Sequence, residues 1–160
     1  MKKFALLTVI TAIFACSQAQ SPRVTAEGTD VKVSYGQPSK KDRVIFGELV
    51  PFNKIWRAGA NEATEITFDK AVSFGGQPVK AGTYSLFVIP TEKEWTVILN
   101  SELKQWGAFG YDKIKDKDVL KVNVPVKQRD AVAEKLTYSF NDNNNLVIEW
   151  DKTMVEIPIK

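Results

Sequence analysis

The chain has 160 residues, of which 44% are hydrophobic, 26% charged and 11% aromatic, a composition typical of one globular domain. It contains no histidine, which excludes Ser-His-Asp and Cys-His nucleophile arrangements and histidine-ligated zinc or copper. Its single cysteine excludes an internal disulfide and a cysteine-rich metal site. The formal net charge is only +3, and basic residues are interspersed with acids, so no nucleic-acid partner is predicted.

The first nineteen residues have the order of a secretory signal peptide. Lys2 and Lys3 precede the apolar stretch 4–15, which small and polar residues follow. Because that stretch is shorter than the roughly 20 residues of a membrane-spanning helix, we predict export with removal of residues 1–19 and no transmembrane segment. Removing Lys2 and Lys3 lowers the formal net charge from +3 to +1.

The sequence allows two alternative positions for cleavage of the signal peptide. Ser17 and Ala19 suit a general signal peptidase that cuts before Gln20, whereas residues 13–16 are similar to a bacterial lipobox that is cut before Cys16. The bulky residue at position 14 fits a lipobox poorly, which favours the first reading. The predicted location is periplasmic or extracellular, with a lipid anchor through Cys16 as the alternative.

In the mature chain the apolar residues recur at every second position, which is the period of a β-strand. The runs 31–35, 120–124 and 136–140 alternate in this way, so each is expected to place one face on a core and the other in water. The runs 84–89 and 95–99 are apolar on nearly both faces, as in central strands covered on two sides.

Turn residues connect these runs and predict antiparallel hairpins. The most secure pairs are 84–89 with 95–99, and 136–140 with 146–150. A final run at 154–159 brings the total to about eight strands, the number expected of a sandwich.

The fold predicted for residues 29–160 is therefore all-β: a single antiparallel β-sandwich or flattened barrel with one long ordered loop. Residues 20–28 are expected to form a loose leader. Short helical turns are expected only near 46–56 and 101–106, because no stretch sustains helical periodicity.

The long loop is the connection 36–65, which exceeds the usual length in compact domains; such connections are mostly functional or disordered. Disorder is unfavourable here because the segment is rich in large apolar residues, and we expect it to pack over the sandwich. The residues expected to need burial are Val44, Ile45, Phe46, Leu49, Val50, Phe52, Ile55 and Trp56.

The same connection carries the predicted ligand-binding residues, in which a guanidinium, an amide and a carboxylate surround Gly59. Such a set can hold a carboxylate, a phosphate or a sugar hydroxyl. Alternatively the loop braces itself, with Arg57 pairing to Glu62 or Glu65 and Asn61 capping backbone groups. The predicted set is Arg43, Trp56, Arg57, Asn61 and Glu62.

A secondary candidate is aromatic. Trp95, Trp106 and Tyr111 would suit a sugar-stacking platform, with core or loop-anchor duty as the alternative. The acids between 112 and 118 alternate with lysines and lack the calcium-loop pattern, so no metal site is predicted. No catalytic residue and no cofactor is predicted either.

Long motifs in the chain resemble those of a known family. They are RVIFGELVP at 43–51, WRAGANEAT at 56–64, AGTYSLF at 81–87, WTVILN at 95–100 and QWG at 105–107. In this order they resemble the Domain of Unknown Function 2911 family of secreted bacterial proteins, over roughly residues 21–160. Asp42 departs from the pattern, which has glycine there. The resemblance implies an exported, mostly β domain, without an assigned activity, cofactor or catalytic residue.

These observations favour a non-catalytic ligand-binding or accessory module of the bacterial envelope that contacts a small molecule, glycan or envelope protein through the 36–65 loop. One alternative is a structural or protein-partner module that docks through sheet edges or the aromatic loop 106–111. Another is a hydrolase or lyase with Glu62 or Glu65 as the base and Arg57 as the anion clamp.

Overall fold

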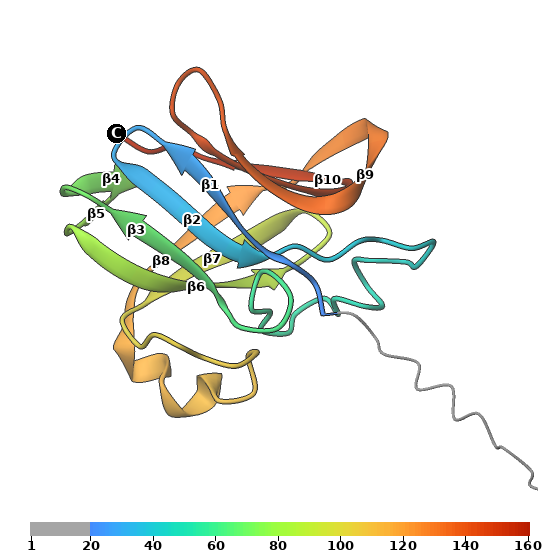
Figure 1. The fold of residues 1–160 in the computed structure, drawn as a ribbon, viewed down its shortest axis with the longest axis horizontal. Coiled ribbons are helices and arrows are strands. Elements are labelled where there is room, and N and C mark those ends of the chain that lie inside the picture. The colour runs from blue at the N-terminus through green and yellow to red at the C-terminus, as the bar shows by residue number, and fades with distance from the viewer. Residues whose placement is uncertain (1–19) are drawn as a thin grey trace, which may run out of the picture.

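The computed structural model describes residues 20–160, so the predicted signal peptide and Cys16 lie outside the described residues. Six antiparallel strands form the first layer of the fold (Figure 1). In order across the sheet they are β1 (Arg23–Gly28), β2 (Val31–Gly36), β3 (Thr64–Phe68), β6 (Gly82–Pro90), β7 (Glu94–Asn100) and β8 (Asp118–Pro125).

The second layer is the long hairpin of β9 (Lys127–Phe140) and β10 (Leu146–Ile157), which lies across one face of the large sheet (Figure 1). A small hairpin of β4 (Val72–Phe74) and β5 (Gln77–Val79) stands beside them. Within residues 20–160 the edge strands β1 and β8 do not pair with each other, so the sheet stays open. The predicted β-sandwich is confirmed, and the flattened barrel is not formed.

The main core lies between the two layers, and a smaller one lies on the opposite face of the large sheet. Leu86 of β6 and Val97 of β7 point toward the β9–β10 hairpin, as members of the main core. Phe87 and Ile98, their neighbours in the chain, point the other way and pack against Tyr111. The two central strands are thus buried on both faces, as their nearly continuous apolar sequence predicts.

Both predicted hairpins are present, β6 with β7 and β9 with β10. The run expected separately at 154–159 mostly belongs to β10, which continues past its polar residues through an irregularity. The register shifts on both sides of Asp151, whose φ is 54°. A β-bulge allows a strand to continue where the alternation of apolar residues is broken.

The N-terminal segment expected to be a loose leader contains a strand instead. β1 pairs antiparallel with β2 over its whole length, from Arg23 to Gly28. Only the modest side chains of Val24 and Ala26 pack against the main core, which explains why its apolar alternation is too weak to stand out in the sequence.

The predicted positions of the helical turns are wrong. The 3₁₀ turns lie at η1 (Tyr111–Lys113) and η2 (Lys115–Lys117). The stretch 46–56 is not helical because Trp56 exchanges two backbone hydrogen bonds with Val88 of β6, at 2.7 and 2.9 Å. Trp56 thereby pairs with β6 two residues beyond Leu86, the residue that pairs with the start of β3. In the described part of the chain, no helix combines the length and apolar character needed to span a membrane.

Candidate functional site

The connection 37–63 between β2 and β3 is ordered and packs on the sandwich, as predicted. Ile45, Val50 and Trp56 are buried in the main core. Val44 and Leu49, which were expected to be buried, are exposed. The connection therefore places some of its apolar side chains on the surface while its anchors enter the core.

The connection is fixed to both layers at Ala58, which adopts a left-handed φ of 54°. The Ala58 carbonyl oxygen accepts hydrogen bonds from the Tyr138 hydroxyl of β9 at 2.6 Å and from Thr64 Oγ1 of β3 at 2.9 Å. Burial raises the pKa of Tyr138, so the hydroxyl stays protonated and remains a donor. The residue next to Ala58, Arg57, is held in place by this double anchor.

Two glycines allow the connection to lie directly on β2. The Ala60 amide donates to the Gly36 carbonyl oxygen at 3.1 Å. A Cβ on Gly36 would lie 2.0 Å from the Ala60 carbonyl oxygen, and one on Gly59 would lie 3.2 Å from the Gly36 carbonyl oxygen and 2.9 Å from Thr64 Oγ1 of β3. Only glycine permits this backbone approach.

Four of the five predicted binding residues line one pocket with a volume of about 350 Å³: Arg43, Trp56, Arg57 and Asn61. Gln20, Ser21 and Trp150 also line it. The fifth, Glu62, does not line the pocket and is exposed. Tertiary structure therefore brings together residues 43, 56, 57 and 61 and leaves Glu62 outside.

The Arg57 guanidinium has no partner among residues 20–160. Its Nε is buried and makes no hydrogen bond, and neither Glu62 nor Glu65 forms an ion pair with it. Desolvation by burial lowers the pKa of Arg57, although a guanidinium remains charged in proteins. The bracing contact suggested for Arg57 from the sequence is therefore not made by this residue.

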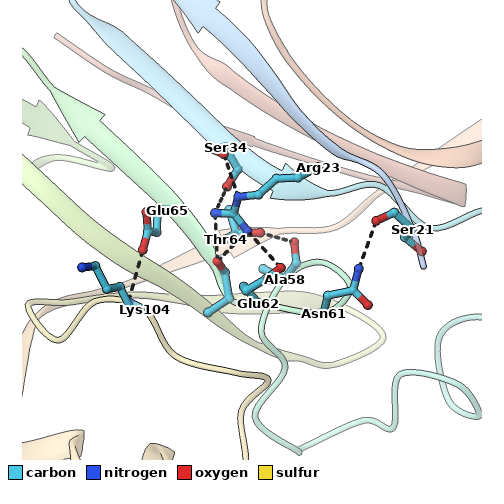
Figure 2. A network of polar contacts seen from close by, with 10 residues as sticks. Ser21, Arg23, Ser34, Ala58, Asn61, Glu62, Thr64, Glu65 and Lys104 are labelled. Atoms are coloured by element: carbon cyan, nitrogen blue, oxygen red, sulfur yellow. Dashed lines mark hydrogen bonds and ion pairs between the residues drawn. The ribbon is translucent and has the colours of Figure 1, made fainter.

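Arg23 makes that bracing contact instead (Figure 2). Its Nε donates to Ser34 Oγ at 2.9 Å, its Nη2 donates to the Ser34 carbonyl at 3.2 Å, and both Nη atoms lie 3.4 Å from the Ala63 carbonyl oxygen. Nη1 also forms a 3.8 Å ion pair with Glu62. Sequence reasoning missed Arg23 because it lies in the segment expected to be a loose leader.

Glu65 and Asn61 are also used within the structure (Figure 2). Glu65 Oε1 accepts a hydrogen bond from the Lys104 amide at 3.2 Å. Asn61, at a left-handed φ of 62°, donates from Nδ2 to the Ser21 carbonyl oxygen at 3.0 Å. This last bond holds the start of the described chain against the pocket.

Arg43 is positioned by backbone carbonyls. Its Nε donates to the Lys40 carbonyl at 2.9 Å, and its Nη2 donates to the Ser39 carbonyl at 2.5 Å. Among the described residues Arg43 forms no ion pair. Arg43 therefore lines the pocket with a positive charge that no carboxylate among residues 20–160 neutralises.

An aromatic cluster lies beneath the pocket. The rings of Trp56 and Trp150 stack at 19° with centroids 6.3 Å apart, and Trp95 meets Trp56 edge-on at 5.9 Å. The indole Nε1 atoms of Trp95 and Trp150 are buried without a partner among the described residues. Sequence reasoning missed Trp150 because the alternation of 146–150 assigns it to the core, which is also correct.

The three residues proposed as an aromatic platform do not come together. Trp95 belongs to the main core and Tyr111 to the smaller core on the opposite face of the sheet. The Tyr111 hydroxyl donates to Asp118 Oδ2 at 2.6 Å, and burial raises the pKa of Tyr111. Trp106 stands apart with 57% of its surface exposed. Trp95 and Tyr111 therefore serve as core residues, as the alternative interpretation of the sequence expected.

No group of three or more Asp, Glu, His or Cys side chains within residues 20–160 is arranged to hold a metal ion. The fold and the site define a class: an all-β sandwich domain whose β2–β3 connection builds a pocket around an unpaired arginine. The chain belongs to the family described as protein of unknown function (DUF2911), whose sequence model matches residues 17–159. Comparison with curated proteins and with solved structures found no match.

Proposed function

We propose that the protein is a non-catalytic ligand-binding module whose ligand occupies the pocket lined by Arg43, Trp56, Arg57 and Asn61. The observation that carries this proposal is the Arg57 guanidinium, whose buried Nε has no partner within residues 20–160. Leaving such a donor unsatisfied costs about 1–3 kcal/mol, and native structures contain few such groups. A polar group kept at a cost to stability is typical of a binding site.

The arrangement of carboxylates favours binding over hydrolase or lyase chemistry. Neither Glu62 nor Glu65 lines the pocket, and each is engaged elsewhere, Glu62 with Arg23 and Glu65 with the Lys104 amide. A general base must reach the reacting group at hydrogen-bond distance. The two carboxylates suggested as bases are therefore not placed to act on a ligand held by Arg57.

Export to the periplasm or beyond is part of the proposal and rests on residues 1–19. Gln20 and Ser21 line the pocket, so cleavage before Gln20 would place the new N-terminus at its rim. Intact mass and N-terminal sequencing of protein recovered from its producing cell test this step. A chain starting at Gln20 is expected, a lipid-modified Cys16 supports the anchored form, and an uncleaved cytoplasmic chain contradicts export.

The binding proposal is tested with Arg57→Ala and Asn61→Ala, with Arg23→Ala as the matched control for loss of a bracing residue. We expect Arg57→Ala to lower the free energy of unfolding by less than about 0.5 kcal/mol or to raise it, because the substitution removes an unsatisfied buried donor. The purified proteins are then titrated with a panel of glycans, peptides and envelope lipids. Binding that Arg57→Ala abolishes is expected. The proposal is wrong if no panel member binds at millimolar concentration, or if Arg57→Ala destabilises as strongly as Arg23→Ala.

A protein-partner role is a second candidate, favoured by the exposed aromatic residues of the segment 106–109. Trp106 is 57% exposed and Phe109 is 88% exposed, and exposed apolar patches often mark interaction surfaces. Trp106 does not line the pocket described above. A Trp106→Ser variant is expected to lose a specific envelope partner in pull-down while retaining small-molecule binding. Retention of the same partner would contradict this role.

A further inference from the structure

A second pocket, with a volume of about 290 Å³, adjoins the first and shares Leu49, Val50, Trp56 and Arg57 with it. The residues that line only the second pocket are mostly apolar, and among its walls the shared Leu49 and the unshared Phe109 are exposed to solvent. Arg57 therefore stands where a polar pocket meets an apolar one. The pair of pockets has the layout needed by a ligand with a polar head and an apolar body.

Gly107 brings the polar and apolar walls together. A Cβ on this residue would lie 2.9 Å from the Phe109 ring and 3.8 Å from Arg57 Nη1. Gly107 also has a left-handed φ of 72°, and its amide donates to the Asn61 carbonyl oxygen at 3.0 Å. The guanidinium and the exposed phenyl ring are thus held beside the same backbone position.

The charges lining the two pockets are all of one sign. Arg43, Lys54 and Arg57 line them, and no Asp or Glu appears among the described lining residues. None of the three cations takes part in the eight ion pairs found within residues 20–160. A concave surface with unpaired cations and no carboxylate attracts anions.

The unsatisfied atoms also specify the chemistry of the ligand. Arg57 Nε and Trp150 Nε1 are buried without partners, and both residues line the first pocket. A guanidinium is a donor only, and Arg57 lines both pockets without a bonded partner within residues 20–160, so a ligand group that pairs with Arg57 must be an acceptor. The tryptophans of the first pocket offer little ring surface on which a neutral sugar could stack, since Trp56 is only 8% exposed and Trp150 only 1%.

We propose that the two pockets together bind an amphiphilic anion, with its carboxylate or phosphate head on Arg57 and its apolar body along Leu49 and Phe109. This inference rests on the proposed function and names the class of ligand. The planar guanidinium matches carboxylate and phosphate oxygens in a two-bond geometry, and Arg43 adds a second positive charge at the first pocket. The apolar body covers side chains that water otherwise contacts.

The test compares small probes by calorimetry and by tryptophan fluorescence, to which Trp56 and Trp150 beside the pocket are expected to respond. Octanoate has both head and body, octanamide keeps the body without the charge, and acetate keeps the charge without the body. We expect octanoate to bind at least about tenfold more tightly than either of the other two. Octyl phosphate, measured beside octanoate, decides whether the head is preferably a phosphate or a carboxylate.

Variants assign the two halves of the ligand to the two walls. Arg57→Gln is expected to weaken octanoate binding about tenfold or more, while Arg57→Lys recovers part of it. Phe109→Ser is expected to weaken octanoate binding about threefold and to leave acetate binding unchanged. Arg129→Gln serves as the control, because Arg129 pairs with Glu149 away from both pockets. Melting curves establish that each variant is folded.

The inference would be overturned if octanoate and octanamide bound equally well, or if Arg57→Gln left octanoate binding unchanged. It would also be overturned if neither octanoate nor octyl phosphate bound at millimolar concentration. Failure of the inference is distinguishable from failure of the proposed function. If a neutral ligand binds and loses affinity in Asn61→Ala, the module binds ligands but not this class. If no probe and no panel member binds, both proposals are wrong.

Discussion

Two arginines, one in β1 and one in the β2–β3 connection, have opposite surroundings. Arg23 of β1 donates to a hydroxyl and to two backbone carbonyls and pairs with Glu62 (Figure 2). Arg57 of the connection has no such contacts within the described residues, although its Nε is buried. The first guanidinium joins β1 to the connection, whereas the second faces a pocket.

This difference separates a residue that stabilises the fold from one that the fold merely holds in position. Satisfied donors contribute modestly to stability, while an unsatisfied buried donor costs free energy. The backbone of Arg57 is fixed by its own carbonyl oxygen, which accepts from the Thr64 amide at 3.1 Å, and by the anchored carbonyl of the adjacent Ala58. The comparison therefore predicts that substitutions around the anchor reduce stability and that substitution of Arg57 itself reduces binding.

The largest effect is expected from Gly36→Ala, which would disturb both regions at once. The new methyl carbon would lie 2.0 Å from the Ala60 carbonyl oxygen, which is a backbone atom and cannot turn away as a flexible side chain could. We expect a loss of about 3 kcal/mol in the free energy of unfolding, measured by urea denaturation. Gly110→Ala is the control, since φ is −91° there and the nearest atom lies at 3.5 Å. Equal stability of the two variants would refute the close approach.

Tyr138→Phe removes one of the two hydrogen bonds to the Ala58 carbonyl and so tests the anchor directly. Loss of this buried bond is expected to cost about 1.5 kcal/mol, again by urea denaturation. Ligand affinity should fall as well, because the anchor holds Arg57 in position. Tyr84→Phe is the matched control, since that hydroxyl bonds to the exposed Lys80 carbonyl. A cost in Tyr138→Phe no larger than in the control would contradict the anchoring role.

Glu156 extends the comparison to a satisfied carboxylate on β10. Hydrogen bonds from Lys127, Asn145 and Asn141 lower the pKa of Glu156 to about 2. Because the unfolded pKa is higher, about 4.3, the charged form stabilises the fold above about pH 4.3 and this contribution is lost as the pH falls toward 2.

Solvent screening limits the Glu156 contribution to about 1 kcal/mol near neutral pH. The wild-type protein should exceed Glu156→Gln by that amount in free energy of unfolding at pH 7, and the difference should shrink between pH 5 and about pH 2. Urea denaturation across this range measures it. A difference that grows on acidification would have the wrong sign.

The smallest changes in the free energy of unfolding are expected from substitutions of the two arginines themselves. Arg23→Gln is expected to cost about 1 kcal/mol, because it removes several partly exposed contacts. Arg57→Gln is expected to stay within about 0.5 kcal/mol of the wild type, or to stabilise. Thermal melts of the two variants side by side provide the measurement. If Arg57→Gln lost more stability than Arg23→Gln, the roles assigned to the two residues would be reversed.

Much of the fold follows from local sequence patterns. Alternation predicts β2, β8 and both hairpins, and the apolar runs 84–89 and 95–99 predict central strands buried on both faces. β1 escapes prediction because its inward side chains are small and its stability comes from pairing with β2. The helical turn expected at 46–56 is absent, and Trp56 at the end of that stretch pairs with a distant strand instead.

For the candidate site, the sequence alone determined which segment to examine: an unusually long, apolar-rich connection with a cluster of polar residues around Gly59. It also excluded histidine-based chemistry and identified the family whose sequence model matches residues 17–159. These conclusions depend only on residue types and on their spacing along the chain, and both can be taken from the sequence without knowing the fold.

Only the tertiary structure decided which arginine braces the fold and which faces a pocket. The partners of Arg23 come from β2 and from the far end of the connection, and the anchor beside Arg57 comes from β9, eighty residues away along the chain. Electrostatic and hydrogen-bond partners act through distances of a few ångströms in space. The separation of two residues along the chain does not determine their distance in space. The roles of Arg23, Arg57 and Glu62 can therefore be assigned only from the folded structure.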